Sequence, residues 1–391
     1  MDVKGAFLQG KEIDRMVIIR PPKEAKTPKL WQLVKCAYGL ADAPRCWYLR
    51  IREELLSLNA QPSKLDNGIF FFYEDDLLGL VILYVDDIMC SGIEAYMKPI
   101  ITKLKLSFKI SHEDDDSFSY VGLKIDQDDD YSICVSQNSY AQAIREIEID
   151  VEKDTHSSLE SEEITRLRGV LGQLNWLSNM TRPDISYGVS KLSANVLKST
   201  VADSKEANKL VKYTKDSASQ IKFPSLDLDS TQILVYTDAS FNNLGDGGSQ
   251  GGQIVFLKDK YGNAFPISWR SNRVRRVARS TLAAETLSFA DGTDAGEYAK
   301  QLVGEFHLNS MNSPVIMITD SKSLFDASNT TSLISDRRLR VEMSSISEIK
   351  EEGEIDIKWV KGEAQLADVL TKKGASSQQL MKVLKEGKIE A

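Results

Sequence analysis

The chain has 391 residues, of which 42% are hydrophobic and 27% charged, and its formal net charge is −8. This length exceeds one ordinary domain and predicts two or three units, each able to bury its own core. No apolar run is long enough to span a membrane and the first residues do not resemble a signal peptide, so we expect an intracellular protein.

Cysteines and histidines are few and scattered. The cysteines form no C-x-x-C pair and the histidines are isolated, which disfavours a zinc site, a disulfide framework and histidine-based acid–base chemistry. Carboxylate-bound Mg²⁺ is therefore the favoured catalytic metal. The cysteines and histidines in question are Cys36, Cys46, Cys90, Cys134, His112, His156 and His307.

The net negative charge argues mildly against a protein that coats nucleic acid non-specifically. The acids are clumped, however, at 114–116 and 128–130, both in expected turns, whereas arginines gather between Arg270 and Arg279. This arginine group could hold the phosphates of a nucleic acid or form a merely solvated loop, and the sequence favours neither interpretation.

In chain order, the first strong pattern is the apolar segment Leu80–Met89, interrupted by Asp86 and Asp87. It predicts a strand, a tight turn and a second strand, with both carboxylates at the tip. Adjacent like charges raise each other's pKa unless a cation neutralises them, and such oxygen ligands suit Mg²⁺. From this segment alone, an ordinary surface turn is an equally good interpretation.

The following segments predict a helix at 95–106, a strand at 118–125 and a polar, acidic linker at 150–163. Beyond the linker the pattern becomes helical, with an apolar stripe and a helix start at Pro183. A third helix is expected at about 203–218. The stripe consists of Leu167, Leu171, Leu174 and Leu177.

A second α/β pattern begins at Ile233. Two apolar strands each end in Thr-Asp, at Asp238 and Asp320, and in both the aspartate lies on the same strand face as two apolar residues. Between them, strands at 253–257 and 264–269 precede a helix that starts near Ser280. Glu285 lies in the apolar stripe of that helix, where an unpaired carboxylate would cost about 2 kcal/mol or more, so we expect it to meet the aspartates around a metal.

The last segments predict a strand at 355–360 and a helix at 365–372 that carries a fourth acid, Asp368. Each acid taken singly has an ordinary structural explanation. Four acids in these strand and helix positions are far better explained by one shared metal site.

Several of these segments resemble the Pol polyproteins of copia-type LTR retrotransposons. The similarity lies in D-V-x-x-A-F-L-x-G from Asp2, in Tyr38–Tyr48, in Tyr84–Asp87 and in Leu177–Tyr187. In the C-terminal part it lies in Ala283-Ala284-Glu285 and Gln365–Lys372. The resemblance covers essentially the whole chain and implies a reverse transcriptase followed by ribonuclease H.

The resemblance implies an α/β and α+β multidomain fold. The expected parts are a reverse transcriptase palm at 1–149 without its fingers, the linker at 150–163, a helical thumb or connection at 164–228 and a ribonuclease H-like domain at 229–391. Two metal-binding catalytic sites follow, made of Asp2, Asp86 and Asp87 and of Asp238, Glu285, Asp320 and Asp368. Nucleotide or substrate contacts are implied for Phe7, Tyr38, Gly39, Arg45 and Tyr84.

The implied cofactor is Mg²⁺, two ions per site, with Mn²⁺ as a substitute. The implied partners are an RNA template, a DNA primer, RNA–DNA hybrid, dNTPs and the rest of the Pol polyprotein, without a membrane. The implied location is the cytoplasm, in a virus-like particle, or the nucleus. Because the strand that should deliver Asp2 is cut short and the fingers are missing, we expect weak polymerase activity beside a competent ribonuclease H.

Two segments depart from the family pattern, and two alternative interpretations remain. Ala41 and Asp42 replace the Lys-Gln that is usual in the family's counterpart of Tyr38–Tyr48. Arg337–Glu342 replaces the family's R-x-K-H-I-D and so lacks its histidine. A non-catalytic nucleic-acid-binding remnant is the main alternative, although it would not need all seven acids. An unrelated two-metal nuclease would explain the segments from Asp238 onward but not the hairpin at 80–89.

Overall fold

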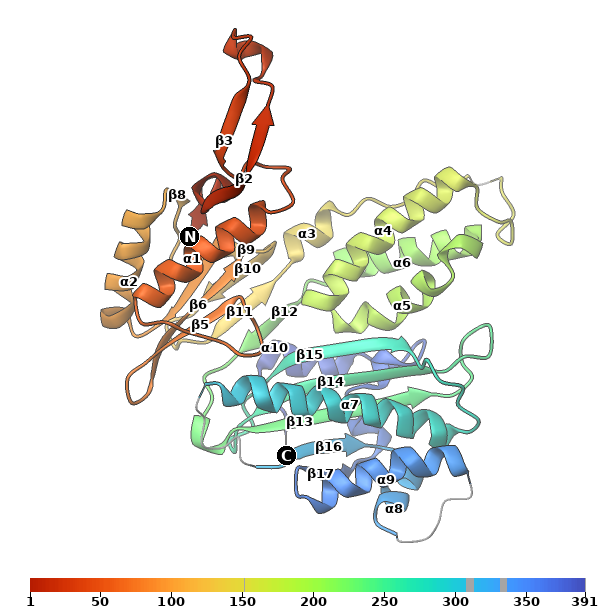
Figure 1. Cartoon of the computed structure of the whole chain (residues 1–391). Helices are drawn as coiled ribbons and strands as arrows, with labels where there is room; N and C mark the ends of the chain where they lie inside the picture. The colour runs from red at the N-terminus through yellow and green to blue at the C-terminus, as the bar shows by residue number, and fades with distance from the viewer. Residues whose placement is uncertain (151, 307–312, 331–335, 391) are drawn as a thin grey trace. The chain divides into compact units, whose positions relative to one another are not determined.

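The computed structural model describes residues 1–150, 152–306, 313–330 and 336–390, so residue 151 of the expected linker and His307 lie outside the described residues. The chain forms two compact units (Figure 1): Met1–Val121 with a short segment from Glu305, and Gly122–Gly304 with the chain from residue 308 onward. The expected multidomain mixture of α/β and α+β structure is confirmed. No helix among the described residues is long and apolar enough to cross a membrane.

The first unit is built on a six-stranded antiparallel sheet. Its strands, in spatial order, are β4 (Gln61–Pro62), β5 (Ile69–Tyr73), β6 (Leu77–Tyr84), β7 (Asp87–Gly92), β1 (Asp2–Val3) and β8 (Ile110–His112). Helices α1 (Ala43–Ser57) and α2 (Glu94–Ser107) pack on one face of it, because their apolar stripes and the β5 to β7 side chains form one buried cluster. The expected hairpin around Asp86 is therefore β6 and β7, held in the middle of the sheet.

A separate hairpin lies between β1 and α1 in the sequence. It consists of β2 (Glu12–Ile19) and β3 (Trp31–Lys35), with the short 3₁₀ helices η1 (Ala6–Gln9) before it and η2 (Lys23–Ala25) at its tip. None of its strand residues is buried, and it projects from the first unit (Figure 1).

The strand expected at 118–125 is interrupted. The structure has β9 (Ser117–Tyr120) and β10 (Leu123–Gln127), separated by Val121 and Gly122, whose φ angles are +50° and +76°. Two consecutive left-handed residues break an extended strand, and the break coincides with the boundary of the two units.

The second unit begins with an antiparallel ladder and a helical bundle. The ladder consists of β10, β11 (Ile133–Ser136) and β12 (Gln220–Phe223), with α3 (Asn138–Ala143) after β11. The bundle contains α4 (Ser161–Met180), η3 (Pro183–Ile185), α5 (Ser186–Ala194), η4 (Val196–Lys198) and α6 (Val201–Asp216). The predicted leucine stripe of α4 is buried in its core, as expected.

The interval expected as a solvated linker is more ordered than its composition indicates. Helix α4 already begins at Ser161, inside that interval, with a capping box between Glu160 and Glu163. The preceding residues form backbone hydrogen bonds to the start of α6, for example from Val201 N–H to the carbonyl of Ser157 at 3.1 Å.

The C-terminal part of this unit is a five-stranded mixed sheet in the order β15–β14–β13–β16–β17. Its antiparallel strands are β13 (Gln232–Ser240), β14 (Gln250–Lys258) and β15 (Ala264–Arg273), and its parallel strands are β16 (Val315–Thr319) and β17 (Ile355–Trp359). The accompanying helices are η5 (Leu228–Ser230), α7 (Thr281–Gly304), α8 (Lys322–Ser328), α9 (Arg337–Glu351), η7 (Gly362–Ala364), η8 (Asp368–Leu370) and α10 (Gln378–Glu386).

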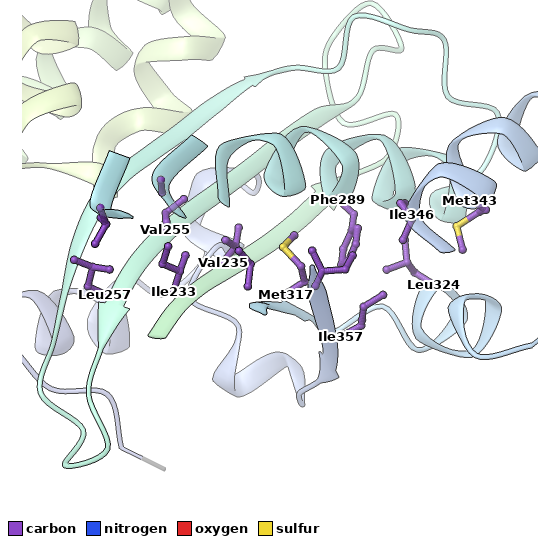
Figure 2. Close-up of a cluster of buried hydrophobic side chains, with 14 of the residues drawn as sticks. Ile233, Val235, Val255, Leu257, Phe289, Met317, Leu324, Met343, Ile346 and Ile357 are labelled. Atoms are coloured by element: carbon purple, nitrogen blue, oxygen red, sulfur yellow. The ribbon is translucent and has the colours of Figure 1, made fainter. Parts of the chain in front are cut away.

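The two faces of this sheet are covered differently. Helix α7 lies across the face that carries Val235 and Val255, where Phe289 fills the core (Figure 2). A Cβ at Gly292 would lie 2.3 Å from Cγ2 of Thr237, so glycine allows α7 to approach β13 this closely. The opposite face is covered by α10 and by the segment around η8.

The helix expected at 365–372 is not an α-helix. The structure has a turn and the short 3₁₀ helix η8 there, η7 ends just before the segment, and α10 is the last helix among the described residues. The segment contributes Leu366, Val369 and Leu370 to the core on the β13 and β14 side. Burial of these residues, rather than helix formation, explains their apolar spacing.

Candidate metal centre

Three of the predicted acids meet at one end of the mixed sheet. Asp238 lies near the end of strand β13, Asp320 directly follows β16, and Glu285 lies in the second turn of helix α7. One carboxylate oxygen from each lies within 4.8 Å of the others. Because parallel neighbours β13 and β16 end side by side, the sheet brings the two aspartates together, and α7 adds the glutamate.

The charges of this cluster are poorly compensated. Asp238 and Glu285 are 1% and 7% exposed, and burial, followed by the charges of Asp238 and Asp320, raises the pKa of Glu285 to about 9. Burial likewise raises the pKa of Asp238 to about 6, although Lys372 and Thr371 oppose this rise. Buried carboxylates that cannot all ionise together are a suitable ligand set for a hard divalent cation.

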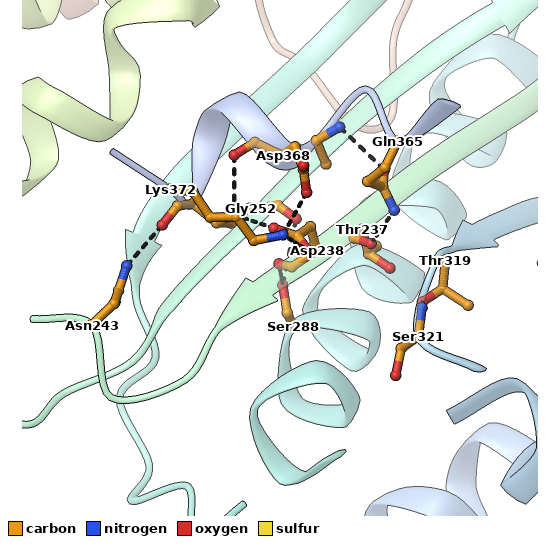
Figure 3. A network of polar contacts seen from close by, with 12 residues as sticks. Thr237, Asp238, Asn243, Gly252, Ser288, Thr319, Ser321, Gln365, Asp368 and Lys372 are labelled. Atoms are coloured by element: carbon orange, nitrogen blue, oxygen red, sulfur yellow. Dashed lines mark hydrogen bonds and ion pairs between the residues drawn. The ribbon is translucent and has the colours of Figure 1, made fainter. Parts of the chain in front are cut away.

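The fourth predicted acid, Asp368, reaches the cluster through a lysine (Figure 3). Lys372 Nζ lies 2.6 Å from Asp368 and 3.3 Å from Asp238, so its ammonium bridges the two carboxylates. The hydroxyl of Thr371 donates to the other Asp238 oxygen. The ammonium of Lys372 therefore lies between the fourth acid and the three clustered acids.

The backbone around these residues is held on both sides. Ser288 of α7 donates to the carbonyl of Asp238 at 2.8 Å, and Asn243 donates to the carbonyl of Thr371 at 2.9 Å (Figure 3). A Cβ at Gly252 would lie 2.6 Å from Cβ of Leu370. Glycine at this position of β14 thus lets the η8 segment lie directly on the sheet.

The acids of the first unit are arranged more openly. Asp2 is the register partner of Asp87 across β1 and β7, and the carbonyl of Asp86 accepts a hydrogen bond from the N–H of Val3 at 2.9 Å. Burial, then the charges of Asp86 and Asp2, raise the pKa of Asp87. Among the described residues, however, only the C-terminal acids form a group of three within 4.8 Å.

The turn that carries these acids has a strained backbone. Val85 has φ +57°, which is unfavourable for a β-branched residue, and its carbonyl accepts a hydrogen bond from the indole of Trp47. Trp47 is 2% exposed in the core under α1. The indole therefore anchors the Asp86 turn to α1, the helix that begins within the Tyr38–Tyr48 segment.

The residues implied in nucleotide or substrate binding lie on the surface of the first unit. Tyr38 and Tyr84 are 60% and 53% exposed, and Arg45 is exposed on α1. The ring of Phe7 lies 5.0 Å from that of Tyr38, and Gly39 has φ +95° in the turn beside it. No structural observation assigns these residues a ligand.

The two departures from the family pattern take part in ion pairs. Asp42 forms a two-pronged pair with Arg15 at 2.9 and 3.0 Å, and Glu342 of α9 pairs with Arg276. In the arginine group, Arg270, Arg275 and Arg276 line a cavity of about 300 Å³ beside α7. Arg273 instead pairs with Asp246, and Arg279 lines a different cavity, so only part of the group lies around this hollow.

Lys372, Thr371 and Asn243 were not assigned a role by the sequence pattern. Asp368 and Lys372 are four residues apart, a spacing typical of paired charges on a helix. That spacing could have indicated the ion pair. The contacts of Thr371 with Asp238 and with Asn243 could not be inferred, because the partners lie more than 120 residues apart in the sequence.

Comparison with known proteins agrees with this picture. Residues 1–155 match the family described as reverse transcriptase (RNA-dependent DNA polymerase). The Pol polyprotein of transposon RE2 from Arabidopsis thaliana is 26% identical over 390 residues, which cover 95% of this chain and 26% of the polyprotein. A putative transposon Ty5-1 protein of Saccharomyces cerevisiae is 27% identical over 299 residues, covering 71% of this chain and 94% of that protein.

Among solved structures, a foamy viral protease-reverse transcriptase in complex with dsDNA is similar, with a TM-score of 0.48 and 14% identity. The match covers 85% of this chain and 61% of that chain. The chain spans about a quarter of the length of the RE2 polyprotein. The matches over nearly its whole length confirm the resemblance of this chain to the Pol polyproteins of copia-type retrotransposons.

Proposed function

We propose that Asp238, Glu285, Asp320 and Asp368 form the metal site of a ribonuclease H that cuts the RNA strand of RNA–DNA hybrids. The observation that carries this proposal is the gathering of three carboxylate oxygens within 4.8 Å, two of them on buried side chains. Burying several carboxyl groups together is costly in a folded chain unless a ligand compensates for it, so such a cluster indicates a binding site.

The donor set fits divalent magnesium or manganese. All the candidate ligands are carboxylate oxygens, and the described residues of the group include no thiolate or imidazole that would favour zinc. Bound in pairs, such ions activate the attacking water and stabilise the leaving oxygen. Asp238, Glu285 and Asp320 would hold them, and Asp368 would join after Lys372 releases it.

The chain's own residues prepare the site for this ligand. Thr371 orients one oxygen of Asp238, and the single positive charge of Lys372 partly compensates Asp238 and Asp368 in the metal-free chain. Because the pKa of Glu285 is raised to about 9, its carboxyl group holds a proton at neutral pH. This proton must leave before Glu285 can bind a metal. The arginine-lined cavity beside α7 supplies positive charge for the phosphates of a hybrid.

We further propose that Asp2, Asp86 and Asp87 form the catalytic end of a reverse transcriptase palm, with an RNA template, a DNA primer and dNTPs as substrates and divalent metal as cofactor. The pairing of Asp2 with Asp87 across adjacent strands supports this, as does the family match of residues 1–155. We expect the nuclease to be the stronger activity of this chain, because its carboxylates are already clustered and those of the palm are not.

Cleavage of a labelled RNA–DNA hybrid by the full chain tests the nuclease proposal. With Mg²⁺ or Mn²⁺ we expect cuts in the RNA strand only, and at least about 100-fold slower cleavage by Asp320→Asn. Asp356→Asn is the matched control, because Asp356 is exposed on neighbouring strand β17. Equal cleavage by wild type and Asp320→Asn would contradict the proposal, and hybrid binding without cleavage would instead support a non-catalytic remnant.

Primer extension on an RNA template tests the palm proposal separately. The expected result is slow, Mg²⁺-dependent incorporation that Asp86→Asn abolishes while hybrid cleavage stays unchanged. Incorporation that persists in Asp86→Asn would refute the assignment of this turn.

A further inference from the structure

The helical bundle and the nuclease-like sheet are in direct contact within the second unit. Trp269 of β15 donates its indole N–H to the carbonyl of Ser178 at the end of α4, at 2.7 Å. Helix α5 packs against β15, and η3 packs against η8, the turn that begins with Asp368. The bundle therefore forms one wall of the segment that carries the fourth acid.

A chain of hydrogen bonds leads from the bundle to that segment. The side-chain amide of Gln250 donates to Ser190 of α5 at 3.0 Å and to Ser271 of β15 at 2.9 Å. Ser271 in turn donates to the carbonyl of Leu370 at 2.5 Å. Gln250 is 1% exposed, so water does not replace these bonds easily.

This series of hydrogen bonds ends next to the proposed metal ligands. Leu370 immediately precedes Thr371 and Lys372, whose side chains contact Asp238. Thus a shift of the Leu370 carbonyl would move both contacts and the bond from Lys372 to Asp368.

The bundle side of this contact is rigid. Arg182 and Asp184, whose side chains are 3% and 0% exposed, form a two-pronged ion pair at 2.9 and 2.8 Å. Arg182 also donates to the carbonyl of Ser217 at 2.8 Å, beyond the end of α6. This pair fixes η3 against α6 and so gives the η8 segment a stable surface.

We propose that the helical bundle positions the fourth carboxylate of the nuclease site, and that Gln250 is the positioning residue that links α5 to the Asp368 segment. Gln250 contacts no metal ligand itself and acts through Ser271 and Leu370. This inference rests on the proposed nuclease function for its kinetic consequences, but the placement of the segment can be measured without activity.

The functional test uses the full chain and four variants. Gln250→Met removes the side-chain amide but keeps a side chain of similar length. Ser190→Ala removes only the hydrogen bond between Gln250 and α5. We expect both variants to lower kcat for hybrid cleavage by about ten-fold, while KM stays within about two-fold of the wild-type value. Both should also weaken Mn²⁺ binding, measured by electron paramagnetic resonance, by about ten-fold. Ser190→Thr, which keeps the hydroxyl, should restore both values, and exposed Ser193→Ala is the matched control.

Hydrogen exchange measures the placement directly, whatever the activity. Amides of 368–372 should exchange several-fold faster in Gln250→Met and Ser190→Ala than in wild type or Ser193→Ala. Unchanged exchange in Ser190→Ala would overturn the role of the bundle, and unchanged exchange in Gln250→Met would overturn the role of the glutamine. A wild-type chain that neither binds Mn²⁺ nor cuts hybrid would overturn the proposed function, and the exchange result would still decide the placement.

Discussion

Glu285 allows the electrostatics of the site to be tested without any nucleic acid. Its pKa rises from an ordinary 4.5 to about 9, first through burial and then through the charges of Asp238 and Asp320. Between these two pH values the folded, metal-free chain keeps a proton that the unfolded chain has released. The corresponding stabilisation is complete below pH 4.5 and is lost as the pH rises through 9.

The size of this effect follows from the shift. A rise from about pH 6.5 to about 8.5, within this window, should therefore lower the free energy of unfolding by roughly 3 kcal/mol. Asp238 adds little in this range, because its pKa is raised only to about 6. Glu285→Gln imitates the protonated side chain and should flatten the pH dependence.

Hydrogen exchange of β13 amides, such as those of Val235 and Tyr236, reports the opening of the second unit in EDTA after correction for the intrinsic pH dependence. Asp294→Asn on the exposed side of α7 is the matched control. Added Mg²⁺ should weaken the fall in stability, because metal and proton compete for the same carboxylate. Equal slopes for wild type and Glu285→Gln would refute the reasoning.

Three further substitutions test particular contacts. Lys372→Met should tighten Mn²⁺ binding several-fold in calorimetry, because it removes the ammonium that competes for the acids, and weaker binding would contradict this competition. Asp184→Asn should lower the free energy of unfolding in urea by about 3 kcal/mol, since it leaves buried Arg182 unpaired; a loss below about 1 kcal/mol would argue against a structural role. Trp47→Phe should destabilise the first unit by about 1–2 kcal/mol in the same assay through the lost bond to Val85, and an unchanged transition would show that this bond is dispensable.

Much of the nuclease-like part could be predicted because local patterns decide it. Strand parity placed Asp238 on the same face as Leu234 and Tyr236, and both apolar residues are buried there. The helical stripe placed Glu285 toward the core, where it is 7% exposed. The leucine stripe of α4 is equally local in origin.

Other features depend on partners far away in the sequence. Apolar spacing at 365–372 is typical of a helix, yet the segment forms a turn and a short 3₁₀ helix, because it lies against β14 at Gly252 and is tied to β15 by Ser271. The hydrogen bonds through Gln250 likewise join three elements that no periodic pattern connects.

The first unit exposes a second limit. The strands at 12–19 and 31–35 bury no residue, so apolar alternation gives little indication of them. The break at Val121 could not be predicted either, because valine favours extended structure and here has a φ of +50°. Only the glycine that follows it marks the turn.

The central claim is that Asp238, Glu285 and Asp320 together hold a divalent ion. Crystals of the full chain grown with Mn²⁺ and measured at the manganese absorption edge would test it most directly. We expect an anomalous peak within bonding distance of an oxygen from each of the three carboxylates. If the three acids instead shared protons or hydrogen bonds and no such peak lay among them, they would not hold a divalent ion.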